Sequence, residues 1–310
     1  ALAEVLHIAP HARVLPALRR GNVRGAITAG LTPRNGGKST AEILEAAAAG
    51  KIECLVLLGA DPLSDVPDAD LARRGISGAR NIIAIDTFIT QSSALADIVL
   101  PAAAYGEKEG TTTNVEGRIS NVAQSITPVG TSRPDWMIAV ELGTATSHDL
   151  GFASYNEVHS AMISGVSEFA PAIDTHAVEH DGVIVAHPTP ITLTRADGAS
   201  NERNSYDYRA VVSRKLYDNA IGTAKSQSLA TLGISAAVIV NPLDVPRIGA
   251  QVGESVRVTS QRATLVLPLQ ESVDVLRGTA WLPINLSGSD ARELLDVTKD
   301  VIDLKIEKMS

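Results

Sequence analysis

Two aspartates follow apolar runs of the chain at points where a carboxylate could recognise a ligand. Asp61 stands in the segment Gly59-Ala60-Asp61-Pro62, after the run 52–58, and Asp86-Thr87 follows the run 81–85. A carboxylate can accept hydrogen bonds from ribose hydroxyls or purine N–H groups. These residues therefore allow nucleotide-like cofactor binding, although the same residue types also end strands by ordinary turn chemistry.

The elements around these aspartates predict a doubly wound, mainly parallel sheet, because apolar strand-like runs alternate with helix-forming segments. The run 52–58 is typical of a strand buried on both faces. Open sheets of this kind bind ligands at the carboxyl ends of their strands, so we expect Asp61 and Asp86 at one edge. The expected elements are helices over 40–49 and 65–74, ended by Gly50 and Gly75, and strands over 52–58, 81–85 and 97–100.

The second half of the chain has a different texture, with short apolar pieces separated by turns, which predicts a smaller β-barrel. Residues 263–267 are apolar on both faces, which predicts a strand between the barrel core and a second layer. The expected strands are 236–240, 256–259, 263–269 and 279–282. We therefore expect an α/β domain over 1–150, a connector over 151–204 and a β-barrel domain over 205–310.

Two further helices are expected outside the sheet and the barrel. Ser132 is placed as the N-cap of a helix that runs to Leu142, with Asp135 completing a capping box. A second helix is expected near 155–169, inside the connector.

Two motifs resemble nucleotide and metal sites but lack a necessary part. Residues 37–40 read Gly-Lys-Ser-Thr, yet a phosphate loop needs a glycine where Thr32 stands, so we expect a plain loop before a helix. His176, Glu179 and His180 follow the order of one class of zinc peptidase, but no third ligand is evident nearby. We expect exposed connector histidines there and no metal site.

Composition excludes several functions. The net charge is −8 and no dense run of Lys and Arg occurs, which argues against nucleic-acid binding. No apolar stretch approaches the roughly 20 residues of a membrane helix, so we expect no direct membrane insertion. The chain starts at Ala1 without a Met, which suggests an excised piece of a longer protein or else a processed N-terminus. Glu4 stands where a signal peptide would be basic, and a single cysteine gives no sign of a secreted fold, so we expect a cytosolic protein.

Cys54 is the only cysteine of the 310 residues. It lies among leucines, so we expect a small buried hydrophobic side chain and no nucleophile. Iron–sulfur clusters need about four thiolates, and an intramolecular disulfide needs two. The chain therefore lacks the ligands for redox chemistry of its own.

Several ordered motifs resemble the third domain of the molybdopterin oxidoreductase superfamily. They are LGADP at 58–62, IDTFITQS at 85–92 and ADIVLPAA at 96–103. The motifs EKEGT at 107–111, NVEGR at 114–118 and RPDW at 133–136 are most similar to the large G subunit of bacterial NADH-quinone oxidoreductase, or complex I. Formate dehydrogenases usually carry a second arginine in place of Gly117.

A weaker resemblance continues through the second half, to the fourth, double-psi-barrel domain of the same superfamily. It is carried by KLYD at 215–218, Gly222-Thr223, NPLD at 241–244 and GESV at 253–256. In active members, positions matching Asp61 and Asp86 help to hold the nucleotide arms of a molybdopterin guanine dinucleotide. The resemblance extends this binding role, in vestigial form, to Gly59, Pro62, Thr87, Gly222, Thr223 and Asn241.

The resemblance implies a structural C-terminal module of the G subunit, with no catalytic residue and no cofactor in this part of the chain. The 4Fe-4S and 2Fe-2S clusters are expected in a preceding N-terminal part, and the partners are other subunits of the peripheral arm, on the cytoplasmic face of the membrane. Residues 225–227 read Lys-Ser-Gln where cofactor-binding relatives tend to carry arginines. The alternatives are a fragment of a molybdopterin-dependent oxidoreductase such as a formate dehydrogenase, which binds the dinucleotide, and a stand-alone nucleotide-binding protein.

Overall fold

The structure is a computed structural model that describes residues 2–9, 11–12, 20–33, 36–166, 169, 181–184, 207–299 and 301–309. The chain divides into two compact units, each made of two separate stretches. Unit 1 consists of Ala1–Ser39 and Leu100–Gly198, and unit 2 of Thr40–Val99 and Ala199–Ser310. This division differs from the predicted domain limits, because residues 40–99 belong to the same unit as the barrel.

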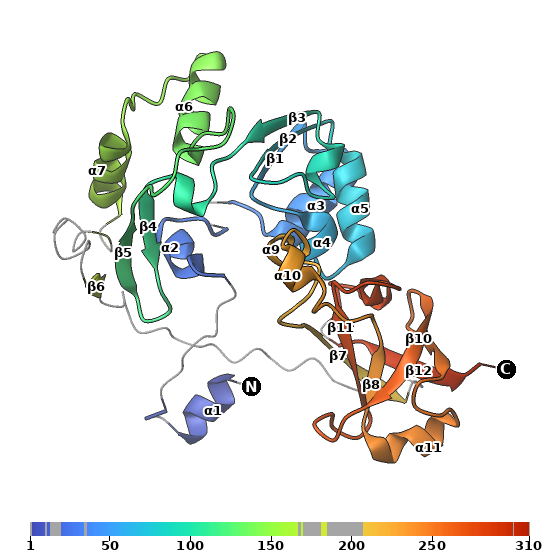
Figure 1. Ribbon diagram of the computed structural model, residues 1–310. Helices are drawn as coiled ribbons and strands as arrows, with labels where there is room; N and C mark the ends of the chain where they lie inside the picture. Colours follow the sequence, from blue (N-terminus) through green and yellow to red (C-terminus); the bar gives the residue numbers. More distant parts are fainter. Residues whose placement is uncertain are drawn as a thin grey trace. The chain divides into compact units, whose positions relative to one another are not determined.

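The first stretch of unit 2 is an α/β layer. Strands β1 and β2 are parallel, and β3 completes a sheet of order β1-β2-β3. Helices α3 and α5 pack on each other and on one face of this sheet (Figure 1). The elements are α3 (Thr40–Ala48), β1 (Cys54–Leu58), α4 (Pro62–Asp65), α5 (Ala69–Gly78), β2 (Asn81–Asp86), η1 (Ser93–Leu95) and β3 (Ile98–Pro101).

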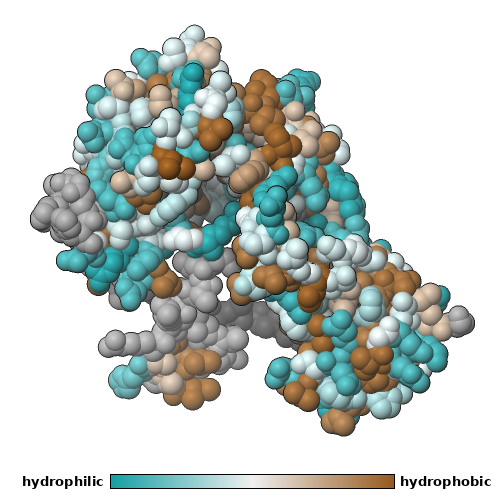
Figure 2. Space-filling model, in the orientation of Figure 1, coloured by the Kyte–Doolittle hydropathy of each residue, from teal (hydrophilic) through white to brown (hydrophobic). Residues whose placement is uncertain are grey.

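The other face of the sheet is open. Leu55 and Leu57 point to the helices and are buried, whereas Val56 is 51% and Leu58 54% exposed. The prediction that this strand is buried on both faces is therefore wrong, and so is the prediction of a buried Cys54, which lies exposed at the first position of β1. Exposed apolar side chains lie on β1 and β3, and Figure 2 shows apolar surface over β3.

Helix α5 begins and ends later than predicted. The predicted helix 65–74 is divided, because Val66 is extended and Asp68 provides the N-cap of α5 by accepting a hydrogen bond from Leu71 N at 2.9 Å. Gly75 is inside the helix and does not end it. A Cβ on Gly75 would lie 2.7 Å from Leu44 Cδ2, so this glycine allows α3 and α5 to cross closely.

The second stretch of unit 2 is a closed β-barrel with strand order β10-β8-β11-β7-β12-β9. Its core contains Tyr208 and otherwise aliphatic residues, which include Val238, Val256, Leu267 and Leu282. The strands are β7 (Tyr208–Arg214), β8 (Val238–Val240), β9 (Ser255–Thr259), β10 (Thr264–Glu271), β11 (Thr279–Ile284) and β12 (Asp303–Lys308). The helices are α9 (Ile221–Ala224), α10 (Gln227–Ala230), η4 (Pro242–Asp244), α11 (Val245–Ile248) and η5 (Ala291–Leu294).

A parallel sheet followed by a closed barrel confirms the predicted fold class. Strand β10 is buried on one face only, because Leu267 and Leu269 enter the core while Val266 is exposed. The predicted second layer over this strand is therefore wrong.

Unit 1 contains the antiparallel sheet β4-β5-β6, and Ile119 packs with Phe169 in a small core. The predicted cap of α6 is wrong: Pro134 is the N-cap, Ser132 Oγ donates to Val129 O, and Asp135 forms an ion pair with Lys108. The elements are α1 (Leu2–Ile8), α2 (Val23–Thr28), η2 (Tyr105–Glu107), β4 (Gly110–Thr113), β5 (Arg118–Val122), α6 (Asp135–Ala145), α7 (Tyr155–Gly165) and β6 (Val183–Ile184). Among the described helices, none has the length and apolar character needed to cross a membrane.

Candidate functional site

The two predicted aspartates do lie at one edge of the parallel sheet. Leu58 and Ile85 are register partners at the carboxyl ends of β1 and β2. Beyond them, Gly59 N donates to Ile85 O at 2.8 Å, and Gly59 turns the chain with a φ of +54°. Asp61 and Asp86 follow at this edge, as the strand pattern predicted.

The Asp61 carboxylate is occupied by its own chain. Its Oδ1 accepts hydrogen bonds from Ser92 N at 3.0 Å and from Ser92 Oγ at 2.5 Å, and its Oδ2 accepts from Ser64 Oγ at 2.6 Å. Ser92 is fully buried, and its Oγ also accepts from Leu63 N at 3.0 Å. Asp61 therefore connects the loop after β1 to the loop after β2.

The loop after β2 is built from local side-chain bonds of the kind that stabilise turns. Asp86 Oδ1 accepts from Thr87 N at 2.7 Å. Thr90 and Ser93 then bond to each other reciprocally, because each backbone N–H donates to the other hydroxyl, at 2.7 and 3.1 Å. These bonds fix the position of Ser92 against Asp61.

Arg214, at the end of β7, is the central cation of a charged cluster that the barrel contributes next to α4. It pairs with Asp218, and its Nη1 donates to Asp65 Oδ1 at 2.6 Å. The side chains of Arg214 and Asp218 are only 7% and 4% exposed. Burial alone would lower the pKa of Arg214, but the hydrogen bonds to Asp218 and Asp65 outweigh burial and raise this pKa above its ordinary value.

Asp218 and Asn285 position the start of α9. Asp218 Oδ1 accepts a hydrogen bond from Ala220 N at 2.8 Å. When the Asn285 amide is oriented with its oxygen toward the donors around it, Asn285 Oδ1 accepts a hydrogen bond from Arg214 at 2.5 Å. Gly222 and Thr223 lie in α9, directly after this cluster. Arg214 and Asp65 therefore connect the Gly222–Thr223 segment to α4, the helix that begins directly after Asp61.

Asn241 lies apart from the other predicted residues. Strand β11 is parallel to β7 and antiparallel to β8, so the end of β8 and the end of β7 lie at opposite ends of the barrel. Asn241 caps η4 by accepting from Leu243 N at 3.0 Å, and it donates to Val275 O at 2.7 Å. These contacts stabilise a turn. The strand directions place this turn at the opposite end of the barrel from Arg214.

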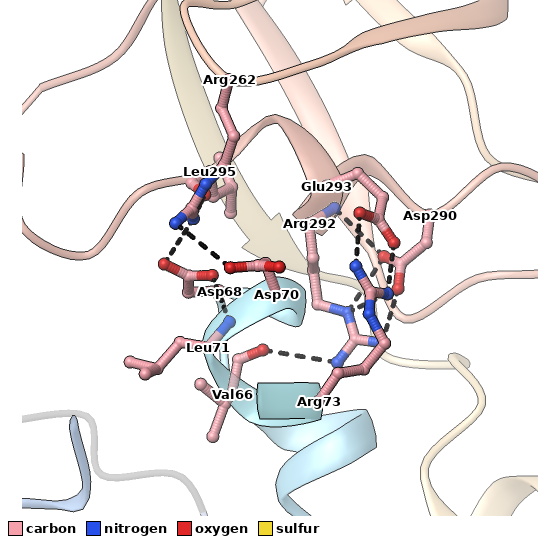
Figure 3. A network of polar contacts seen from close by, with 10 residues as sticks. All are labelled: Val66, Asp68, Asp70, Leu71, Arg73, Arg262, Asp290, Arg292, Glu293 and Leu295. Atoms are coloured by element: carbon pink, nitrogen blue, oxygen red, sulfur yellow. Dashed lines mark hydrogen bonds and ion pairs between the residues drawn. The ribbon is translucent and has the colours of Figure 1, made fainter. Parts of the chain in front are cut away.

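An ion-pair network that the sequence did not predict joins α5 to the barrel (Figure 3). Asp68 pairs with Arg262 at 2.5 Å, and Arg262 also lies 3.7 Å from Asp70 and donates to Leu295 O. The Asp68 side chain is 2% exposed. The hydrogen bond to Asp68 raises the pKa of Arg262, which keeps this guanidinium charged.

The second half of the network lies one helical turn further along α5. Arg73 donates to both carboxylate oxygens of Glu293, at 2.5 and 2.7 Å, and this hydrogen bonding raises its pKa. Arg292 is held by Asp290 and donates to Val66 O at 3.3 Å. Bidentate pairs of this kind fix orientation, so the network joins the α/β layer to the barrel within unit 2.

The sheet edge fits a dinucleotide poorly. Three donors already occupy the Asp61 carboxylate, and two carboxylates neutralise Arg214. A pyrophosphate requires cationic or N–H donors that are available to it. In the part of the chain that the structure describes, no group of three His, Cys, Asp or Glu side chains could hold a metal ion. His176, Glu179 and His180 lie outside the described residues.

The family comparison matches the first part of the chain. Residues 14–145 match the family described as molybdopterin oxidoreductase. The match includes all of the α/β layer and the sheet edge that carries Asp61 and Asp86.

Curated relatives cover most of the chain. The alpha subunit of an NADPH-Fe(3+) oxidoreductase from Geobacter sulfurreducens is 24% identical over 89% of this chain and 32% of its own length. The alpha subunit of F420-dependent formate dehydrogenase 2 from Methanococcus maripaludis is 25% identical over 86% of the chain and 43% of its length. A G-type subunit of NADH-quinone oxidoreductase from Rhizobium meliloti is 25% identical over 82% of the chain and 30% of its length. The chain thus spans less than half the length of these relatives.

A solved structure shares the fold. The acetylene hydratase from Pelobacter acetylenicus superposes with a TM-score of 0.61 at 15% identity, over 88% of this chain and 47% of that one. Its name describes a hydratase, so this fold alone does not define a redox reaction.

Proposed function

We propose that this chain is a structural module of an oxidoreductase, the C-terminal part of the iron–sulfur G subunit of an NADH-quinone oxidoreductase. In this role it supplies folded surface to the peripheral arm of the complex, on the cytoplasmic side of the membrane, and transfers no electrons itself. The 4Fe-4S and 2Fe-2S clusters belong to a part of the subunit outside this chain.

One observation carries the proposal: the polar groups at the sheet edge serve the fold. The Asp61 carboxylate joins two loops, and Arg214 joins the barrel to α4. The single cysteine of the sequence cannot bind an iron–sulfur cluster. The similarity to the G subunit of NADH-quinone oxidoreductase supports the choice of complex.

Metal analysis of the full-length protein tests this proposal. We expect iron and acid-labile sulfide from the clusters, and molybdenum and tungsten well below one atom per chain. Stoichiometric molybdenum or tungsten, together with a pterin released on denaturation, would contradict the structural role.

Substitution of Asp61 tests the role of the sheet edge directly. We expect Asp61→Ala to lower the free energy of unfolding by about 2–3 kcal/mol, because it leaves Ser92 and Ser64 without a charged acceptor. Thr87→Ala, at an exposed position of the same edge, should change this free energy by less than about 0.5 kcal/mol. Denaturant titration of both variants gives the comparison. If Asp61→Ala lowers the free energy of unfolding as little as Thr87→Ala does, Asp61 has no structural role.

The alternative is a fragment of a molybdopterin-dependent oxidoreductase such as a formate dehydrogenase, which retains molybdopterin guanine dinucleotide. The similar identity to a formate dehydrogenase subunit favours it. Calorimetric titration with GMP separates the two proposals: the structural module gives no binding heat at millimolar GMP. The alternative, like a stand-alone nucleotide-binding protein, gives saturable heat that Asp61→Ala and Asp86→Ala both remove.

A further inference from the structure

Unit 1 contains a cavity of about 280 Å³ that no part of the proposed function uses. It lies among α2, the strand β4 and α7, and its walls come from small and apolar side chains. The lining includes Gly25, Ala26, Thr113, Tyr155, His159 and Met162. None of the described residues that line it is Asp, Glu, Lys or Arg, so the cavity suits an uncharged molecule.

One polar atom in this cavity wall has no partner. His159 Nε2 is buried and makes no hydrogen bond within the described residues. About 90% or more of buried polar groups in folded proteins do have a partner, so an unpaired buried nitrogen in a cavity wall indicates a missing ligand group. The ring of His159 is fixed by stacking on Tyr155, with 5.6 Å between ring centroids.

Two wall residues, Gly25 and Asn22, hold α2 close to β4. A Cβ on Gly25 would lie 2.3 Å from Asn22 Oδ1 and 3.0 Å from Thr113 Oγ1, so α2 can approach β4 this closely only with glycine. Asn22 Oδ1 also accepts from Thr113 N at 2.8 Å, which ties the start of α2 to β4. Burial, and then the negative charge of Glu109, raise the pKa of Tyr155, so this phenol stays neutral.

We propose that this cavity binds a small, uncharged aromatic molecule that carries one hydroxyl group, with the hydroxyl hydrogen-bonded to His159 Nε2. A hydroxyl both donates and accepts, so it can pair with Nε2 whether or not that nitrogen carries a hydrogen. A dry apolar cavity of about 150 Å³ already holds benzene, so the larger volume here accommodates two fused rings. Ligand pockets commonly have this character, apolar walls with a few placed polar groups.

Titration of the full chain with 2-naphthol tests the proposal, with naphthalene as the matched probe without a hydroxyl. We expect saturable binding of one 2-naphthol per chain by calorimetry. His159→Phe keeps the aromatic contact with Tyr155 and removes the nitrogen, so it should weaken 2-naphthol about tenfold and change naphthalene binding by less than about twofold. Ala26→Leu fills the cavity and should weaken both probes.

Three results would overturn the proposal. They are an absence of saturable 2-naphthol binding up to its solubility limit, equal effects of His159→Phe on the two probes, and unchanged binding in Ala26→Leu. If His159→Phe does not fold, the unsubstituted protein provides the readout by nitrogen NMR. The His159 Nε2 resonance should then move with 2-naphthol and not with naphthalene, and a resonance that responds equally to both probes refutes the hydrogen bond.

Discussion

The ion pair between Asp68 and Arg262 gives a sharp test of how unit 2 is held together. Asp68→Ala removes the N-cap bond to Leu71 N, which contributes about 1 kcal/mol in typical helices. It also removes the charged partner that lies 2.5 Å from Arg262. Breaking a buried pair on one side costs about 3–5 kcal/mol.

The two terms add to about 4–6 kcal/mol, and two features place the expected loss at or just below the lower end of this range. The Arg262 side chain is 27% exposed, so water can solvate it in part, and Asp70 stays 3.7 Å away. We therefore expect Asp68→Ala to lower the free energy of unfolding of unit 2 by about 3–4 kcal/mol.

The two tryptophans make this measurement possible. Trp136 lies in unit 1 and Trp281 in unit 2, so fluorescence in a Trp136→Phe background reports on unit 2. Guanidinium titration then gives the free energy of unfolding. Arg74→Ala is the matched control, because its exposed pair with Asp70 should contribute less than about 0.5 kcal/mol.

A double-mutant cycle with Arg262→Ala isolates the pair itself. Two results would refute a stabilising ion pair: a loss in Asp68→Ala below about 1 kcal/mol, the value of the cap alone, or a cycle that gives no coupling energy.

Three further predictions concern other parts of unit 2. Arg214→Ala leaves Asp218 buried without its ion-pair partner, so we expect a loss of about 3–5 kcal/mol in denaturant titration, and a loss near zero would contradict the paired geometry. Gly78→Ala would place a Cβ 2.3 Å from Ala47 O and should lower the free energy of unfolding by about 1–3 kcal/mol. Gly222→Ala, with open space around it, should be neutral or slightly stabilising. Equal shifts of the melting temperature in the two variants would refute the close packing of α5 on α3. Hydrogen bonds from Thr298 hold the pKa of Asp296 below its ordinary range, so this carboxylate stabilises the fold above its unfolded pKa, and that contribution is lost as the pH falls through the lower folded pKa. Thr298→Val removes the side-chain bond and should move the carboxyl titration midpoint of Asp296 upward in carbon NMR, and an unmoved midpoint would contradict this cause.

Strand positions and the shared sheet edge could be predicted because they depend on local patterns. An apolar run followed by Gly59 or Asp86 defines the end of a strand, and parallel pairing then brings those ends together. Strand β12 carried the same kind of signal, since Leu304 and Ile306 alternate with polar residues and both are buried, yet it was not among the predicted strands. The hairpin of β4 and β5 around Gly117 was missed in the same way.

Contacts between distant residues could not be predicted from one sequence. Asp68 is a recognisable helix cap, but nothing near it indicates Arg262, which belongs to the other stretch of unit 2. Likewise, the sequence suggested that the Asp61 carboxylate is available to a ligand. Its main hydrogen-bond partner, Ser92, lies on the loop after the next strand, and the sequence does not reveal this contact. Exposure also depends on what covers a face, so the leucine-rich sequence around Cys54 suggested burial where the structure has an open face.

The interleaving of the two units has a consequence for synthesis on the ribosome. Residues 40–99 emerge well before the barrel residues that complete their unit, and ribosomes add about 5–20 residues per second. Asp68 therefore exists for roughly 10–40 s before Arg262 has been translated. During this interval the nascent α/β layer lacks the arginine that pairs with Asp68, so it cannot yet form the ion-pair network that joins it to the barrel.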